Sequence, residues 1–140
     1  ISTITLVDVN REWFKSCQGL TKTEGDRAIS FCGHALLENE IMVIPDTKKD
    51  KRFSDNPVVI GSPYIRFYAG VPIMSVDNQR VGVFCIKDIK PRKFSEGSKE
   101  DLKQMAVWIE REINLRNMSL SMTEQDKIVE KYLTNPLKNK

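Results

Sequence analysis

The sequence predicts an α+β fold in which a sheet is covered on both faces by helices. Short apolar segments with a period of two, separated by turn residues, occupy residues 2–88 and are typical of strands. One of them, RVGVFCIKD at 80–88, is apolar on both of its faces, which indicates a central strand covered on both sides. From residue 96 onward the apolar residues recur at helical spacing instead, which predicts one long helical region.

The N-terminal part is predicted to form a hairpin, a short helix and a third strand. Residues 2–8 and 12–19 flank a tight turn and form the hairpin. In SFCGHALLENE (30–40), Ser30 can cap a helix, but the internal glycine weakens it, so a short helix is expected. IMVIPD at 41–46 is a strand that ends at its proline.

A polar loop separates this strand from the next hairpin. Residues 47–63 are rich in Asp, Asn, Ser, Pro and Gly, which favours two short helical turns. The strand PYIRFYAGVP (63–72) follows, and turn residues at 77–79 join it to 80–88. Its alternation places Ile65, Phe67, Ala69 and Val71 on one face and Arg66 and Tyr68 on the other.

The C-terminal helix carries two apolar stripes. The stripe expected to pack on the sheet contains Leu102, Met105, Ala106, Ile109, Ile113 and Leu120. The opposite stripe contains Val107, Trp108, Leu115, Met118 and Met122. A helix that covers the sheet of a monomer needs only one apolar face, so the second is covered by another helix of the same chain or by a homodimer partner. Ser121 and Glu124 predict the cap of a further short helix.

Composition limits the classes of partner. The 140 residues fit one domain, and the net charge of +3 comes without the basic stripe and exposed aromatics of a nucleic-acid-binding protein. No apolar run approaches the ~18 residues of a membrane span. Three widely spaced cysteines predict reduced, buried thiols and a cytoplasmic location. Because the chain begins at Ile1 inside a strand pattern, we expect it to be a piece of a longer polypeptide.

Three stretches, RAISFCGHAL, VIPDTKKDKRFSDNPVVIGSPYIRFYAGVPI and VGVFCIKDIKPRKFS, resemble a GAF domain. The resemblance extends from about Thr3 to Arg116 and is to the subtype found in signalling proteins with histidine kinases and nucleotide cyclases. It implies a PAS-like antiparallel sheet of six strands and a small-molecule pocket on the side away from the terminal helices. It also implies dimerisation through those helices, which relay to an effector domain in the same polypeptide.

The resemblance divides the chain into a GAF domain at 1–118, without the family's usual N-terminal helix, and a helical extension or linker at 119–140. It implies a regulatory role without chemistry of its own, so this domain is expected not to be an enzyme, although the full-length protein can carry a kinase or cyclase. Two alternatives are an enzyme of the free methionine sulfoxide reductase kind and a structural dimerisation module that binds no ligand.

Arg66 is the residue that most needs explanation, because a charge beside an apolar strand must be paired. We expect its guanidinium to point between the sheet and the 46–62 loop, where it either anchors the loop through an Asp or clamps a ligand. In the family arrangement Arg66 and Tyr68 face this loop, which roofs the pocket. The candidate ligand-binding residues are Asp46, Arg52, Phe53, Asn56, Arg66, Tyr68, Cys32 and His34.

The thiols and the single histidine do not predict a catalytic or metal centre, and no cofactor is expected. Cys32 and His34 lie two residues apart on a helix, so their side chains point in different directions. A zinc site is disfavoured because no close-spaced ligand pair exists. Lys87-Asp88 replaces the Asn-Lys of cyclic-nucleotide-binding GAF domains, and the Cys-His pair that attaches a bilin in photoreceptors is missing.

Overall fold

The computed structural model describes residues 1–134, with side chains for residues 1–127. Six strands form one sheet in the order β3-β2-β1-β6-β5-β4, and each neighbouring pair is antiparallel. This sheet confirms the predicted α+β fold. The strands are β1 (Ser2–Val7), β2 (Arg11–Gln18), β3 (Glu24–Asp26), β4 (Met42–Ile44), β5 (Phe67–Met74) and β6 (Arg80–Asp88).

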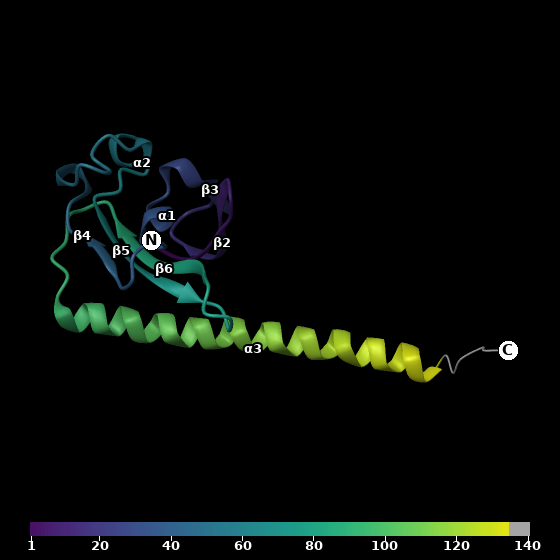
Figure 1. Cartoon of the computed structure of the whole chain (residues 1–140). Helices are drawn as coiled ribbons and strands as arrows, with labels where there is room; N and C mark the ends of the chain where they lie inside the picture. Colours follow the sequence, from purple (N-terminus) through teal and green to yellow (C-terminus); the bar gives the residue numbers. More distant parts are fainter. Residues whose placement is uncertain (135–140) are drawn as a thin grey trace.

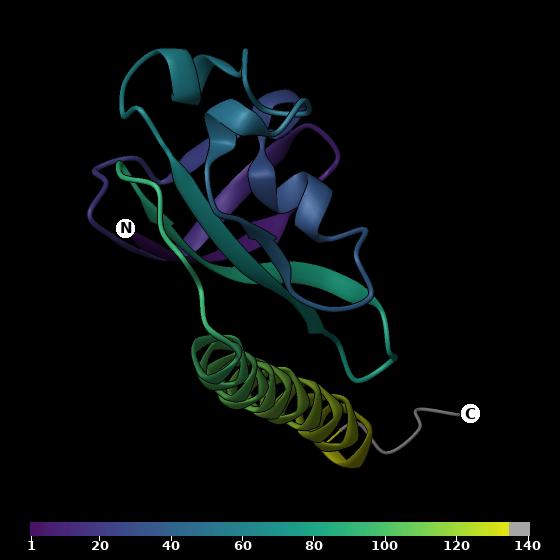
Figure 2. The same cartoon turned by 90° about the vertical axis from the view of Figure 1, so that its left-hand side faces the viewer.

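Helices cover both faces of the sheet. One face carries the long α3, while the short helices lie on the other side, as Figures 1 and 2 show. The alternation of β6 matches this arrangement, because Val83 and Cys85 belong to the core on the short-helix side and Phe84 to the core under α3. The helices are η1 (Arg27–Ile29), α1 (Phe31–Ala35), η2 (Thr47–Lys49), α2 (Pro57–Ile60) and α3 (Glu96–Thr134).

Each short helix begins at a side chain that accepts a hydrogen bond from the backbone. Ser30 accepts from Gly33 at the start of α1, and Asn56 accepts from Val58 at the start of α2, where Pro57 occupies the first turn. Asp26 and Asp46 cap η1 and η2 in the same way. These caps explain how elements of only three to five residues form, since side-chain acceptors satisfy amide groups that have no partner within the helix.

The α3 helix differs from its prediction in two respects. It continues without a break to Thr134, so the separate short helix expected after Ser121 does not form and the described chain does not fold back over Trp108. In addition, Met105 and Leu120 are exposed rather than packed on the sheet. Met105 lies about 60° from the centre of the stripe at 100° per residue, and Leu120 belongs to residues 115–127, which are all exposed. The C-terminal part of α3 extends past the sheet (Figure 1).

The remaining predicted elements are present, with shifted boundaries. The strand expected from residue 63 begins at Phe67, because the preceding residues form a turn in which Ile65 donates its amide to the Val58 carbonyl. The short edge strand β3 was not predicted; it pairs with β2 through Gly25 and its neighbours. Within residues 1–134, no helix combines the length and apolar character needed to cross a membrane.

Candidate functional site

The Arg66 guanidinium forms a fork with the carboxylate of Asp46. Nη2 lies 2.9 and 3.1 Å from the two oxygens, and Nε lies 3.1 Å from the nearer one. Thr47 adds a backbone bond to the Arg66 carbonyl at 2.9 Å. Burial alone raises the pKa of Asp46, but the hydrogen bonds from Arg66 hold it below its ordinary value. The expected pairing of Arg66 with an Asp of the loop is therefore present, while its role in ligand binding stays a prediction.

Three other candidate residues, Phe53, Tyr68 and Cys32, lie in the core. Phe31 stacks between the rings of Phe53 and Tyr68, with centroids 4.4 and 5.1 Å away. The Tyr68 hydroxyl donates to the Cys32 sulfur at 3.4 Å. Gly70 leaves room for the Tyr68 ring, because a Cβ there would lie 2.3 Å from the hydroxyl oxygen. These contacts are those of a packed core.

The last three candidates hold the loop together. Arg52 pairs with Asp50 at 2.7 Å and lies over the Phe53 ring. His34 Nδ1 bonds the Ser30 carbonyl at 3.1 Å, as expected for a structural histidine. Asn56 donates to the carbonyl of Ile29 at 2.9 Å and so ties α2 to η1.

The structure does not bring the eight candidates together around one cavity. Instead, an inner cavity of about 470 Å³ lies beside them on the face of the sheet opposite α3, and its volume is typical of small-molecule sites. None of the eight lines it. Its lining consists of Glu12, Phe14, Leu20, Thr21, Lys22, Glu24, Gly25, Asp26, Ile29, Phe31, Val58, Ser62, Pro63, Ile65 and Lys87.

Two opposite charges are buried in the wall of the inner cavity. Glu12 on β2 and Lys87 on β6 are only 7% and 8% exposed. Glu12 accepts a hydrogen bond from the Ser30 hydroxyl through one of its oxygens. Burial lowers the pKa of Lys87, but the Cys85 and Cys32 sulfurs and the Glu12 carboxylate outweigh it and raise the pKa above its ordinary value. Lys87 is therefore a charged ammonium at neutral pH.

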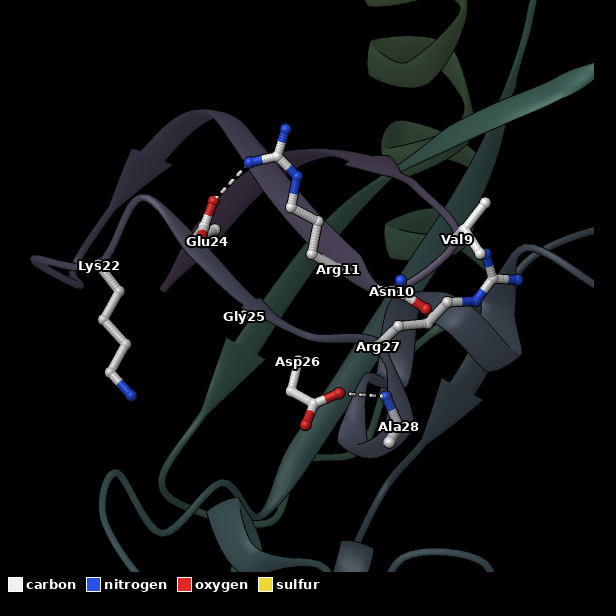
Figure 3. A pocket seen from close by; sticks show the side chains of 9 residues that line it. All are labelled: Val9, Asn10, Arg11, Lys22, Glu24, Gly25, Asp26, Arg27 and Ala28. Atoms are coloured by element: carbon white, nitrogen blue, oxygen red, sulfur yellow. Dashed lines mark hydrogen bonds and ion pairs between the residues drawn. The ribbon is translucent and has the colours of Figure 1, made fainter.

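A second, outer hollow of about 950 Å³ lies on the other side of β3. Figure 3 shows its charged side chains, most of which are bonded to another side chain or to the backbone. Arg11 pairs with Glu24 at 2.7 Å, and Asp26 caps the amide of Ala28 at 2.8 Å. Arg27 donates to the backbone carbonyl of Asp8. Because these charges are exposed and all but Lys22 have a bonded partner among the described residues, the outer hollow is a weaker candidate site than the inner cavity.

Two of the three free cysteines form a buried pair behind the cavity. The sulfurs of Cys32 and Cys85 lie 3.6 Å apart, and Thr3 bonds the Cys85 sulfur at 3.0 Å. Burial alone raises the pKa of Cys85, but hydrogen bonds from Cys32 and Thr3 and the charge of Lys87 lower it to about 6. Within the residues that the structure describes, no group of three or more His, Cys, Asp or Glu side chains is placed to hold a metal.

Sequence reasoning missed Glu12, Phe14 and Lys87 as cavity residues. A usable signal existed, because Lys87 interrupts an apolar strand just as Arg66 adjoins one. The position of Glu12 could not be found in this way, since β2 has an exposed face as well as a buried one and a charged residue there suggests the exposed face.

Comparisons with known proteins identify the family. The sequence model of the GAF domain matches residues 2–113. The chain belongs to the GAF domain family. It is 39% identical over 92 residues to a cyclic di-GMP phosphodiesterase of Pseudomonas aeruginosa; the match covers 66% of this chain and 16% of that protein. The chain thus spans about a sixth of the length of this curated relative.

Solved structures show the same fold at low identity. A domain from a two-component sensor histidine kinase protein of Sinorhizobium meliloti superposes with a TM-score of 0.61 at 15% identity, over 89% of this GAF domain chain and 83% of that one. A free methionine-R-sulfoxide reductase of Neisseria meningitidis, solved with its substrate, also gives a TM-score of 0.61, at 21% identity over 79% of this chain and 62% of that chain.

These comparisons correct the expectation that this domain is not an enzyme. The curated relative bears the name of a phosphodiesterase, and the fold also occurs in free methionine-R-sulfoxide reductases. Membership of the GAF family therefore does not exclude catalysis, and the expectation was wrong to do so. What the comparisons support directly is a GAF domain of the kind found in signalling proteins.

Proposed function

We propose that this chain is a sensory GAF domain that binds a small molecule in the inner cavity and relays occupancy through α3 to an effector domain in the same polypeptide. Residues 1–118 form the sensory unit in this proposal, and the helix beyond them is the connection to the effector. The proposal places the protein in the cytoplasm. A phosphodiesterase effector fits the P. aeruginosa relative, of which this chain matches only a part.

The observation that carries the proposal is the continuous path from the cavity through β6 and β5 to α3. Lys87 on β6 lines the cavity, while Phe84 and Ile86 on the same strand belong to the core under α3. Leu102 and Ala106 supply the α3 side of that core. α3 packs on β5, and β5 pairs with β6 along its length, so a ligand that shifts β6 would act on α3 through β5 and the shared core, without an intervening loop.

The exposed stripe on α3 supports a homodimer as the form that transmits the signal. Trp108 is 64% and Leu115 63% exposed, and Val107 and Met118 are also exposed on the same side. Monomeric proteins rarely leave such a run of large apolar side chains in water. Because the described part of α3 does not fold back, a second copy is the occupant that this surface fits, with the α3 helices side by side.

A cavity-blocking variant tests the ligand site. Val58→Trp would fill the inner cavity from α2, whereas Val9→Trp adds the same ring to the outer hollow and serves as the control. We expect at least one compound from a panel of nucleotides, amino acids and organic acids to raise the melting temperature of the wild type and of Val9→Trp, but not of Val58→Trp. Shifts that survive Val58→Trp would contradict the proposed site.

The dimer is tested by sedimentation. Trp108→Glu should convert a dimer into a folded monomer, because it places a charge in the centre of the exposed stripe. Leu37→Glu changes an equally exposed apolar residue away from α3 and should leave the dimer intact. A wild type that sediments as a monomer at high concentration would contradict the dimer and favour a module without an α3 interface.

A second candidate function, sulfoxide reduction, is favoured by the Cys32–Cys85 pair. A thiolate at Cys85 could attack the sulfur of a sulfoxide, giving a sulfenic acid and the sulfide, after which Cys32 would form the disulfide and release water. Incubation with free methionine sulfoxide and dithiothreitol, followed by quantitation of methionine, tests this function. Turnover that disappears in Cys85→Ser but not in Cys17→Ser would support it, and no turnover in the wild type would exclude it.

A further inference from the structure

The ammonium of Lys87 lines the inner cavity and has no acceptor among the described side chains. Lys87 is 8% exposed and lines the cavity. Among the residues whose side chains the structure describes, no hydrogen bond or ion pair involves its Nζ, although its own backbone groups are bonded to Ile1. Nζ lies 5.5 Å from the centroid of the Phe14 ring. Because Nζ has no bonded acceptor there, an anionic group in the cavity could form a charge-assisted hydrogen bond with it.

The carboxylate in the same wall is only partly satisfied. The Ser30 hydroxyl donates to Oε2 of Glu12, and no hydrogen bond to Oε1 is found within residues 1–127. Gly25 allows this oxygen its position, because a Cβ at residue 25 would lie 2.8 Å from it. Glu12 can therefore accept one further hydrogen bond from a group inside the cavity.

The surfaces between these two charges are apolar. Phe14 and Phe31 contribute rings, and Val58 and Ile65 contribute aliphatic groups. Such a lining favours a ligand with a hydrocarbon body, while the two polar groups fix its orientation. The cavity also has polar residues in its lining, namely Thr21, Lys22, Glu24, Asp26 and Ser62. Its wall thus combines an anion-binding ammonium, a hydrogen-bond acceptor and these four apolar side chains.

We propose that the inner cavity recognises a small organic acid, whose anionic group binds Lys87 and whose hydrogen-bond donor faces Glu12. This inference rests on the proposed function, in which a small molecule occupies the cavity, and adds the chemical class of that molecule. Lys87 and Glu12 are then specificity-determining residues, and the missing acceptor of Lys87 is supplied by the ligand.

A series of six-carbon probes isolates the contribution of charge. Hexanoate carries the anion, norleucine carries the anion and a donor, and hexan-1-ol and hexylamine keep the hydrocarbon without the anion. Binding to the whole chain is measured by calorimetry and by the change in melting temperature. We expect the wild type to bind hexanoate about tenfold or more tightly than hexan-1-ol, as a charge-assisted hydrogen bond predicts, and norleucine at least as tightly as hexanoate.

Lys87→Met removes the ammonium and keeps the length of the apolar stem. In this variant we expect hexanoate and hexan-1-ol to bind equally. The matched control is Lys22→Met, which changes an exposed lysine at the same cavity and should retain the preference for hexanoate. Glu12→Gln should reduce the advantage of norleucine and leave the preference for hexanoate over hexan-1-ol.

Three results would overturn the organic-acid proposal. The first is that the wild type binds hexanoate and hexan-1-ol equally, and the second is that it binds neither hexanoate nor norleucine. The third is that Lys87→Met, without any added compound, melts at a temperature well below that of the wild type. The last result would mean that the ammonium already has a partner in the empty protein. Equal binding of all four probes leaves a cavity that binds small molecules, whereas compound-induced shifts unaffected by Val58→Trp refute the proposed function itself.

Discussion

Arg66 and Lys87 are two buried or half-buried cations on the side of the sheet opposite α3, and they differ in what surrounds them. Arg66 meets both oxygens of Asp46 in a planar fork, with distances of 2.9 to 3.1 Å. Lys87 reaches the inner cavity and has an aromatic ring, but no bonded acceptor, beside its ammonium. Among the residues whose side chains are described, Arg66 has a carboxylate partner and Lys87 has none.

The difference separates structural from functional charge in this domain. A paired guanidinium can hold the 46–62 loop against the sheet, because its geometry matches a carboxylate on that loop. Nearby charges raise the pKa of Lys87, but no hydrogen-bond acceptor for its Nζ is found among the described side chains, so its place in the cavity wall requires another explanation. A ligand supplies that explanation. Buried charge alone is thus a weaker sign of a site than buried charge without a partner.

The largest expected effect in this comparison is the loss of the Arg66 fork. Arg66→Ala leaves Asp46, whose side chain is only 14% exposed, without its main partner. Removing one member of a buried pair costs ~3–5 kcal/mol, and we expect about 3 kcal/mol here because Arg66 is partly exposed. The free energy of unfolding from urea titration measures it. Arg66→Lys should recover only part of the loss, since a point charge cannot form the fork.

Full stability of Arg66→Ala combined with lost binding of hexanoate would reverse the comparison. Arg66 would then be the ligand clamp, and Lys87 would need a structural account. We expect the opposite, because Arg66 does not line the inner cavity.

A second, smaller effect separates the two regions by pH. The pKa of Cys85, lowered to about 6 beside Lys87, lies below the ~8.5 of an unfolded thiol. The unfolded chain therefore binds more protons between these values, so stability should rise as pH increases from 6 to 8.5 and fall as pH returns to 6. We expect the free energy of unfolding to change by about 1–2 kcal/mol in total over this range. A single titrating group can change it by at most about 1.4 kcal/mol per pH unit.

The Arg66–Asp46 pair should be insensitive over the same range. The lowered pKa of Asp46 means that its contribution is present above about pH 4 and is lost only at lower pH. Urea titrations between pH 6 and 9 provide the test. Cys85→Ser should flatten the profile, and Cys17→Ser should not, because Cys17 lies outside the buried pair; an unchanged slope in Cys85→Ser would contradict the lowered pKa.

The two regions also show how much of the structure can be predicted from the sequence. The Arg66 pairing was predictable, because a charge beside an apolar strand requires an acceptor and the neighbouring loop is rich in Asp. The hairpins, the short capped helices and the sheet-facing stripe of α3 followed from local patterns in the same way. The inner cavity did not. Its wall combines β2, β6, η1, α1 and the segment after α2, and only the folded sheet brings Glu12 and Lys87 to one space.

The candidate residues that lie in the core, and not at the inner cavity, share a physical explanation. Phe53, Tyr68 and Cys32 belong to the same segments as true loop contacts, but their side chains fill the core. A sequence motif identifies the segment that surrounds a site. It does not show whether a given side chain of that segment contacts a ligand or packs against other residues of the protein. Likewise, the period of α3 placed Leu120 on the sheet-facing side of the helix, but Leu120 is exposed, because the point at which the sheet ends is a tertiary property.

The smallest effect is expected for Arg52, which sharpens the comparison by separating burial from pairing. Like Arg66, Arg52 pairs with an Asp of the loop, at 2.7 Å, but its side chain is 45% exposed and Asp50 is its neighbour in sequence. An exposed pair contributes ~0.2–1 kcal/mol, so Arg52→Ala should lower the free energy of unfolding by about 0.5 kcal/mol, including its contact with the Phe53 ring. Hexanoate binding should not change, because Arg52 lies outside the inner cavity. Urea titration beside Arg66→Ala measures the difference. If Arg52→Ala and Arg66→Ala lost equal stability, burial would not explain the strength of the Arg66–Asp46 pair. The comparison of Arg66 with Lys87, which depends on the effect of burial on charge pairs, would then fail.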